Sequence, residues 1–294
     1  MGVLFAILGM LSFGANMLIT RYAVARMPIE AGFLVVLGTN MIFPALLFPL
    51  ELGLRAAPFA WDWKGFALFA LSGVIGTFLG RRALFDTVRL LGPSLASVFH
   101  SSAPAFAFVG AWLLAGEALG VQDVALIALV WAGLWLAQPR AGVRPQSAER
   151  VRSGVIAGLL ATAGFGLGNV VRGLSMRAWQ EAFLGTAIAA SAAFVLQLAV
   201  TRDWARVRQS FATGGGRAIA LYVACGIATS LGSIFVTLAM KHMEIGLAVL
   251  IVHTTPLFVI PASVFILRQR ERISGRMLTG AALILCGIAA LLLR

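Results

Sequence analysis

The sequence predicts an all-α membrane protein with ten transmembrane helices, arranged as two inverted five-helix repeats. Of the 294 residues, 60% are apolar and only 12% are charged, and the mean hydropathy is +0.95. Ordinary soluble domains are about 45–50% apolar and about 25% charged. The apolar residues form long runs, and one span with its turn takes about 25–30 residues. The chain length therefore allows about ten to twelve spans and leaves almost nothing for a soluble domain.

Apolar windows of about 20 residues locate the spans in order. The first window lacks the basic n-region and the small-residue cleavage site of a signal peptide, so we interpret it as a first span. Pro28, Pro58 and Pro93 interrupt the chain before the second, third and fourth windows. The predicted spans are 2–21, 29–50, 64–87, 93–115, 121–138, 153–173, 181–201, 217–240, 245–267 and 273–293.

The most polar connection divides the chain into two nearly equal halves. It runs from Gln138 to Ser153 and contains Pro139 and Pro145. We expect an N-terminal five-helix repeat at 1–139, a linker loop at 140–152 and a C-terminal five-helix repeat at 153–294.

The two halves resemble each other in sequence. Phe13-Gly14-Ala15-Asn16 corresponds to Phe165-Gly166-Leu167-Gly168-Asn169, and His100-Ser101-Ser102-Ala103-Pro104 corresponds to His253-Thr254-Thr255-Pro256, at offsets of 152–154 positions. This indicates an internal duplication. Five is an odd number of spans, so the second copy enters the membrane upside down. Inverted repeats of this kind are typical of carriers that alternate access around a midplane site.

The net charge of +12 does not indicate a nucleic-acid partner, because the basic residues instead determine how the chain is oriented in the membrane. The basic residues lie in short clusters between apolar runs, where they meet lipid headgroups. The positive-inside rule places both termini on the periplasmic side, because only six of the 23 basic residues lie on the side of the termini. These six are Arg55, Lys64, Arg172, Arg177, Lys241 and Arg294.

The layout and several motifs resemble a known transporter family. The Phe-Gly-x-Asn region of the first helix and the run from Thr87 to Ser97, which leads to Pro104 and Glu117, resemble the EamA-type branch of the drug/metabolite transporter superfamily. The resemblance implies a multi-pass carrier of the bacterial inner membrane that exports small metabolites, similar to bacterial exporters of aromatic and broad-range amino acids. It also implies a cavity lined by the first, third, fourth, sixth, eighth and ninth helices.

Polar residues deep inside spans are the candidates for substrate contact. His100 and His253 each lie about 10 Å inside a span, too deep to reach the headgroups, so they face either protein or a water-filled cavity. Asn16 and Asn169 suit both ends of a zwitterion, but they equally suit bonds between helices. Arg82 either snorkels, pairs with Asp86 or binds an anion. The candidate substrate-binding residues are Asn16, Arg82, Phe99, His100, Ser101, Asn169, His253 and Thr254.

Small residues and prolines are the candidate hinges. Pro104 and Pro256 each remove an intrahelical hydrogen bond and free a carbonyl one turn earlier. Gly166 lies in a glycine-rich stretch of the sixth span. These three residues are the predicted hinges of an alternating-access motion, although plain packing and simple kinks also explain them.

The sequence disfavours other function classes. No midspan aspartate pair and no HExxH motif is present, so we do not expect an enzyme, a cofactor or a metal site. A channel would show a ring of like charge or a carbonyl filter, and neither is found. No Asp or Glu lies in the middle of a span, which disfavours cation/proton antiport and leaves passive uniport or a histidine-based coupling. Because the family resemblance implies amino-acid export, we expect facilitative transport of amino acids. A proton-coupled multidrug transporter or a nucleotide-sugar transporter is the alternative. The expected partners are a small-molecule substrate and the lipid bilayer, and the expected form is a monomer.

Overall fold

The computed structural model describes residues 1–54, 58–137, 147–265 and 275–292, and every regular element within them is a helix. The helices are α1 (Gly2–Val24), α2 (Ile29–Leu54), α3 (Trp63–Ser72), the π-helix η1 (Gly73–Gly80), α4 (Arg81–Leu91), α5 (Pro93–Ser101), α6 (Ala103–Ala115), α7 (Val121–Ala137), α8 (Ala148–Ala178), α9 (Ala182–Val200), α10 (Trp204–His242), α11 (Ile245–His253), α12 (Pro256–Phe265) and α13 (Gly275–Leu292).

Seven helical segments of this described part are long and apolar enough to cross a membrane. A shorter apolar segment spans Ile245–Val259. The helices follow the windows expected from hydropathy, because each window is a run of apolar residues ended by proline, glycine or a polar cap. The seven segments are Gly2–Val24, Ile29–Gly53, Trp63–Leu91, Leu95–Ala115, Ala148–Ala178, Ala182–Val200 and Trp204–His242.

The helix ends follow from local chemistry. The side chain of Asp62 accepts hydrogen bonds from the backbone N–H groups of Lys64 and Gly65 at the start of α3, and Asp203 accepts one from Arg206 at the start of α10. These bonds satisfy N–H groups that have no partner within the helix. Gly92 and Gly116 follow α4 and α6 with φ of 88° and 66°, a conformation that favours glycine.

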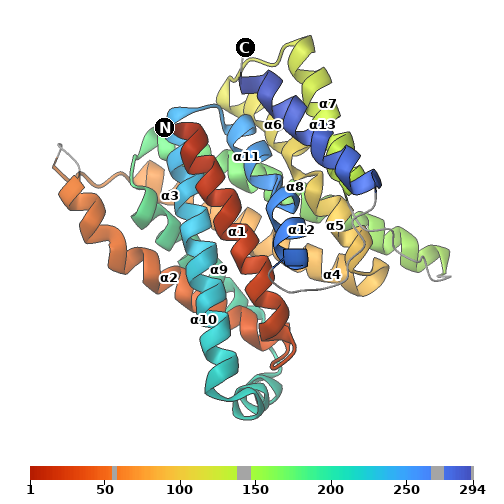
Figure 1. Ribbon diagram of the computed structural model, residues 1–294. Helices are drawn as coiled ribbons and strands as arrows, with labels where there is room; N and C mark the ends of the chain where they lie inside the picture. Colours follow the sequence, from red (N-terminus) through yellow and green to blue (C-terminus); the bar gives the residue numbers. More distant parts are fainter. Residues whose placement is uncertain (55–57, 138–146, 266–274, 293–294) are drawn as a thin grey trace.

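The helices form one bundle with α8 at its centre (Figure 1). Helix α1 packs along α10, α2 along α9, and α7 along α13. Helix α8 packs against α3, η1 and α4 and also against α6. The start of α1 and the end of α13 lie toward the same end of the bundle (Figure 1).

Close helix contacts occur at glycines, and these contacts come in pairs. A Cβ on Gly14 would lie 2.4 Å from Phe258 Cδ1, and one on Gly166 would lie 2.6 Å from Phe106 Cβ. Both members of the second pair lie 152 positions from their counterparts in the first. The contact of Gly2 with Met243 and that of Gly154 with Leu91 are related by the same shift. Glycine lets the backbones approach closely where apolar lipid gives little drive for association.

The third expected span and the start of α10 are two places where the helices differ from expectation. The third expected span contains the π-helix η1, in which hydrogen bonds run from i to i+5. Helix α10 begins at Trp204, in a stretch expected to connect two spans, and it bends at Gly215, where φ is 66°. Its first turns are held because Val207 and Phe211 pack on a cluster that includes Met27.

Candidate functional site

Two histidines from different halves of the chain meet inside the bundle. His100 lies in the last turn of α5, His253 ends α11, and their ring centroids are 5.3 Å apart. The edge of the Phe165 ring packs on His100 at 4.7 Å between centroids. His253 Nδ1 lies 2.8 Å from the carbonyl oxygen of Val249, whereas His100 Nδ1 is buried and has no hydrogen-bond partner within the described residues. The structure therefore brings together two of the expected site residues.

Each histidine precedes a break in its helix. Helix α5 ends at Ser101 and α6 resumes at Ala103, and α11 ends at His253 before α12 begins at Pro256. A proline cannot donate the hydrogen bond to the preceding turn, so the chain turns at these points. The hydroxyl of Thr162 on α8 donates to the Phe99 carbonyl beside the first break, at 2.8 Å. Both proline positions thus coincide with real interruptions of the helix.

A second cluster of polar side chains lines a small cavity of about 40 Å³. Asn16 and Thr20 face it from α1, and Arg81 faces it from the start of α4. The guanidinium of Arg81 lies 5.3 Å from the centre of the Phe33 ring, and its Nε is buried with no hydrogen-bond partner among the residues described. The cavity is lined by Asn16, Thr20, Ile29, Phe33, Val36, Arg81, Phe85, Tyr222 and Thr229.

Phe165 on α8 has contacts near both the Arg81 cavity and the histidine pair. Gly80, the residue before Arg81, packs so tightly on α8 that a Cβ there would lie 3.2 Å from the backbone nitrogen of Phe165. The Phe165 ring also contacts the His100 ring. Phe165 thus meets the residue before Arg81 through its backbone and His100 through its ring.

Arg82, which the sequence indicated, is exposed and lies over the Phe78 ring at 5.8 Å. Its neighbour Arg81 lines the cavity instead. The π-helix η1 immediately before these residues changes the angle between successive side chains, so faces assigned with a 3.6-residue period shift after it. The sequence reasoning missed Arg81, and only the density of glycines before it signalled an irregular segment.

The remaining expected site residues lie around these two regions. The Asn169 amide donates to the Phe165 carbonyl at 2.9 Å, within its own helix. The buried hydroxyl of Thr254 donates to the Ile251 carbonyl at 2.6 Å and lies 3.2 Å from Met10 Sδ. Local bonds of this kind satisfy polar groups inside apolar surroundings.

Phe99 and Ser101 face other neighbours than the histidine pair. The Phe99 ring packs on Gly158, where a Cβ would come within 2.5 Å of it. Ser101 lines a separate apolar cavity together with Trp131. Neither side chain is part of the cavity that holds Arg81.

Two carboxylates, Glu51 and Glu117, cap the N-termini of other helices. Glu51 accepts hydrogen bonds from backbone N–H groups at the start of α9, including that of Phe183 at 3.0 Å. Glu117 does the same for Ile245 at the start of α11, at 2.7 Å, and also pairs with Arg177. Carboxylates at helix N-termini satisfy free N–H groups and complement the helix dipole.

Arg172 requires a correction to the orientation count. The count placed it in a loop, but it lies inside α8, where it is 9% exposed and its Nε has no partner in the described part of the chain. Arg172 is thus buried inside the bundle, whereas Arg81 is half-buried at its cavity. Within the described part of the chain, no group of three or more His, Cys, Asp or Glu side chains lies close enough to hold a metal ion.

The fold and these buried polar positions define a multi-pass, all-helical membrane protein. The chain belongs to the EamA-like transporter family of the drug/metabolite transporter superfamily, which it matches over residues 1–137 and 152–293. Members of this family are transporters rather than enzymes, and they are typically found in the inner membrane. The family resemblance inferred from the sequence is confirmed.

One solved structure, described only as a crystal structure of a protein, is similar to this chain with a TM-score of 0.75 and 20% sequence identity. The similarity covers 99% of this chain and 96% of that chain. At this identity the likeness shows the fold alone. Among curated proteins, no sequence matches this chain.

Proposed function

We propose that this transporter is an alternating-access carrier that exports small metabolites bearing a carboxylate, with amino acids as the expected cargo. The cargo binds between the Arg81 cavity and the histidine pair. Transport is facilitative, and the moving parts are the helices that break near Pro104 and Pro256 and those that meet at Gly166. In this proposal the chain crosses the membrane ten times, as two inverted five-helix repeats at 1–139 and 153–294.

The paired glycine contacts support the two-repeat architecture. Contacts of Gly14 and Gly166 are related by the shift that relates the two halves of the sequence. The family match also falls into two segments of similar length, separated by the expected linker. The two chain ends lie toward the same end of the bundle, as an even number of crossings requires (Figure 1).

The placement of Arg81 is the main support for a carboxylate-bearing substrate. A guanidinium inside a membrane protein is costly unless it is paired, and this one has a buried Nε without a partner. Arginine binds carboxylates in a two-pronged geometry, and its charge remains at any physiological pH. An anionic group of the cargo would therefore complete the site, whereas a cationic dye would be repelled.

The neighbours of Arg81 suit the rest of an amino acid. Asn16 and Thr20 offer neutral hydrogen-bonding groups in the same cavity. Phe33 and Phe85 line the same cavity, and Phe165 packs on His100, so aromatic surface is available for an apolar side chain. This arrangement supports aromatic and other hydrophobic amino acids within the proposed range.

The experiment is flux in proteoliposomes that contain the purified protein. Labelled amino acids, nucleotide sugars and cationic dyes are each tested with and without an imposed proton gradient. We expect saturable amino-acid flux that does not depend on the gradient. Movement of dyes driven by protons, or flux of nucleotide sugars alone, would contradict the proposed cargo.

Two adjacent arginines provide a matched pair of variants. Arg81→Gln removes the guanidinium that lines the cavity and should raise the half-saturation concentration about tenfold or more, because a hydrogen bond to a charged group contributes about 1.5–3 kcal/mol. Arg82→Gln removes the same charge from an exposed position and should leave flux near the wild-type level. The reverse order of the two effects would refute the assignment of Arg81.

A further inference from the structure

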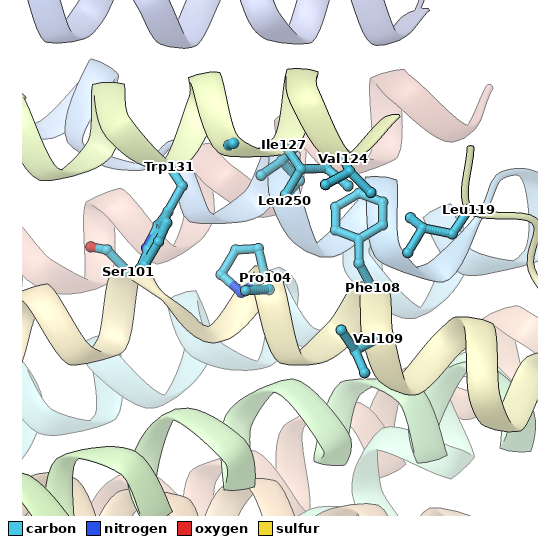
Figure 2. Close-up of a pocket in the computed structure, with 11 residues that line it drawn as sticks. Ser101, Pro104, Phe108, Val109, Leu119, Val124, Ile127, Trp131 and Leu250 are labelled. Carbon is cyan, nitrogen blue, oxygen red and sulfur yellow. The ribbon is translucent and has the colours of Figure 1, made fainter. Parts of the chain in front are cut away.

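An apolar cavity of about 200 Å³ lies beside the break between α5 and α6. Pro104 and Phe108 rise into it from α6, and Trp131 descends from α7 toward Ser101 (Figure 2). Leu250 of α11 closes it on the inner side. The complete lining is Ser101, Pro104, Ala105, Phe108, Val109, Leu119, Val124, Ile127, Ala128, Trp131 and Leu250.

The rim of this cavity continues onto the outer surface of the bundle. Val109, Val124 and Trp131 are 49%, 51% and 48% exposed, although each is a large apolar side chain. Neighbouring exposed residues include Leu113 and Trp135. In a membrane protein such a surface faces lipid, so the cavity is continuous with the protein–lipid interface.

The indole N–H of Trp131, which belongs to the cavity lining, already has a hydrogen-bond partner. The indole N–H of Trp131 donates to the hydroxyl of Ser102 at 2.9 Å, and that hydroxyl donates to the Val98 carbonyl at 3.0 Å. Apolar cavities of this kind do not hold water, because water needs two or more polar partners. An unfilled cavity would lose dispersion contacts along its walls.

We propose that this cavity binds the acyl chain of a membrane lipid, which enters from the bilayer and rests against Pro104. The acyl chain is the apolar group that the bilayer supplies at the rim, and it gives the cavity walls the contacts that they otherwise lack. The bound chain fills the space between α6 and α7 next to a helix break. It therefore supports the bent form of this segment, independently of the substrate site at Arg81.

The first test uses the wild-type protein in vesicles of phosphatidylethanolamine and phosphatidylglycerol. A fraction of the phosphatidylethanolamine carries a photoactivatable diazirine in its acyl chain. After illumination and digestion, mass spectrometry should find labels concentrated on the α6 segment from Ala105 to Val109 and on the α7 segment from Val124 to Trp131. Labels spread evenly over all lipid-facing helices would overturn the proposal.

The second test compares two variants of α7. Ala128→Phe adds a ring to the cavity wall, and Ala125→Phe adds the same ring to an exposed position that does not line it. Native mass spectrometry of the purified proteins should show a retained phospholipid on the wild type and on Ala125→Phe, and a severalfold loss of it on Ala128→Phe. Equal retention by all three proteins would contradict the assignment.

The apolar part of the cargo is the competing occupant. If it occupied the cavity, saturating substrate would displace the photoactivatable lipid from the wild-type protein, and Ala128→Phe would change the half-saturation concentration for transport. We expect labelling that does not change with substrate. Displacement by substrate would overturn the lipid assignment without affecting that of Arg81.

Discussion

The carboxylate of Glu117, in the connection after α6, caps the N-terminus of α11 by accepting the backbone N–H of Ile245 at 2.7 Å. It also accepts the N–H of Gly246 at 3.2 Å and pairs with Arg177 near the end of α8. Arg177 in turn donates to the carbonyl of Ala115 at the end of α6, at 2.8 Å. One acidic side chain thus joins the ends of three helices.

Glu117→Gln should lower the thermal stability of the protein. The amide keeps the size of the side chain but loses the charge that attracts Arg177 and the N-terminus of α11. Charged caps and partly buried charged hydrogen bonds contribute about 1–2 kcal/mol, so the expected loss of unfolding free energy is of this size. Thermal unfolding of the purified protein in detergent measures it.

Glu149→Gln provides the control, because Glu149 is an exposed carboxylate in the first turn of α8. Its melting temperature should stay close to that of the wild type. If both variants melted at the same temperature, the contacts of Glu117 would contribute no more to the unfolding free energy than an exposed carboxylate does.

The sequence was a good guide wherever the physical signal is local. Apolar runs and prolines located the helices, and Pro104 and Pro256 marked the two breaks. The role of Glu117 could not be predicted in this way, since its partner Ile245 lies 128 positions further along the chain. Nothing near Glu117 in sequence indicates which helix N-terminus it will meet.

The candidate site shows the same division. The repeat directed attention to His100 and His253, and their contact links positions on two distant helices. Depth in the span and the spacing to Asp86 indicated Arg82, and neither signal shows which of two adjacent arginines lines the cavity. The hydrogen bond from the Asn169 amide to the Phe165 carbonyl, in contrast, is a local interaction that polar side chains commonly form within helices.

Substitution of His100 or Asn16 by alanine should lower transport much more than it lowers expression or folding. His100 has an unpartnered buried nitrogen beside Phe165, and Asn16 lines the Arg81 cavity. Initial rates of amino-acid flux, normalised to folded protein by size-exclusion chromatography, measure the effect. We expect at least about a tenfold loss, as for one lost hydrogen bond to substrate.

Thr254→Val is the comparison for these two variants. The Thr254 hydroxyl already donates within α11, so its removal should leave flux near the wild-type level. Wild-type flux in His100→Ala and Asn16→Ala would remove both residues from the proposed site. A loss for Thr254→Val as large as theirs would show that flux responds to packing rather than to these polar groups.

Gly166→Ala should destabilise the protein, because α6 passes directly over this position. A Cβ there would lie 2.6 Å from Phe106 Cβ and 2.7 Å from the backbone oxygen of Ala103. Backbone atoms cannot yield as a flexible side chain can, so the helices must separate, at a cost of about 1–3 kcal/mol. Gly38→Ala, at a helical position where an added Cβ would meet no atom within 4 Å beyond its own turns of helix backbone, should be neutral or stabilising by about 0.5–1 kcal/mol. Thermal unfolding of the two variants should therefore shift in opposite directions, and a Gly166→Ala protein as stable as Gly38→Ala would contradict the close packing.

Glu244 should make stability depend on pH with a defined sign. It precedes α11, outside the spans, where burial and the nearby Glu117 carboxylate raise its pKa and Arg177 opposes the shift. Because the folded pKa lies above the unfolded one, the folded state favours the protonated form, and the resulting stability is lost as the pH rises through the folded pKa. Glu244→Gln should therefore raise the melting temperature at about pH 7 and have little effect at about pH 3, where the wild-type carboxyl is mostly protonated in both states. Melting curves across this range measure the difference. A variant that melts below the wild type at neutral pH, or that differs from it equally at every pH, would contradict this account of Glu244.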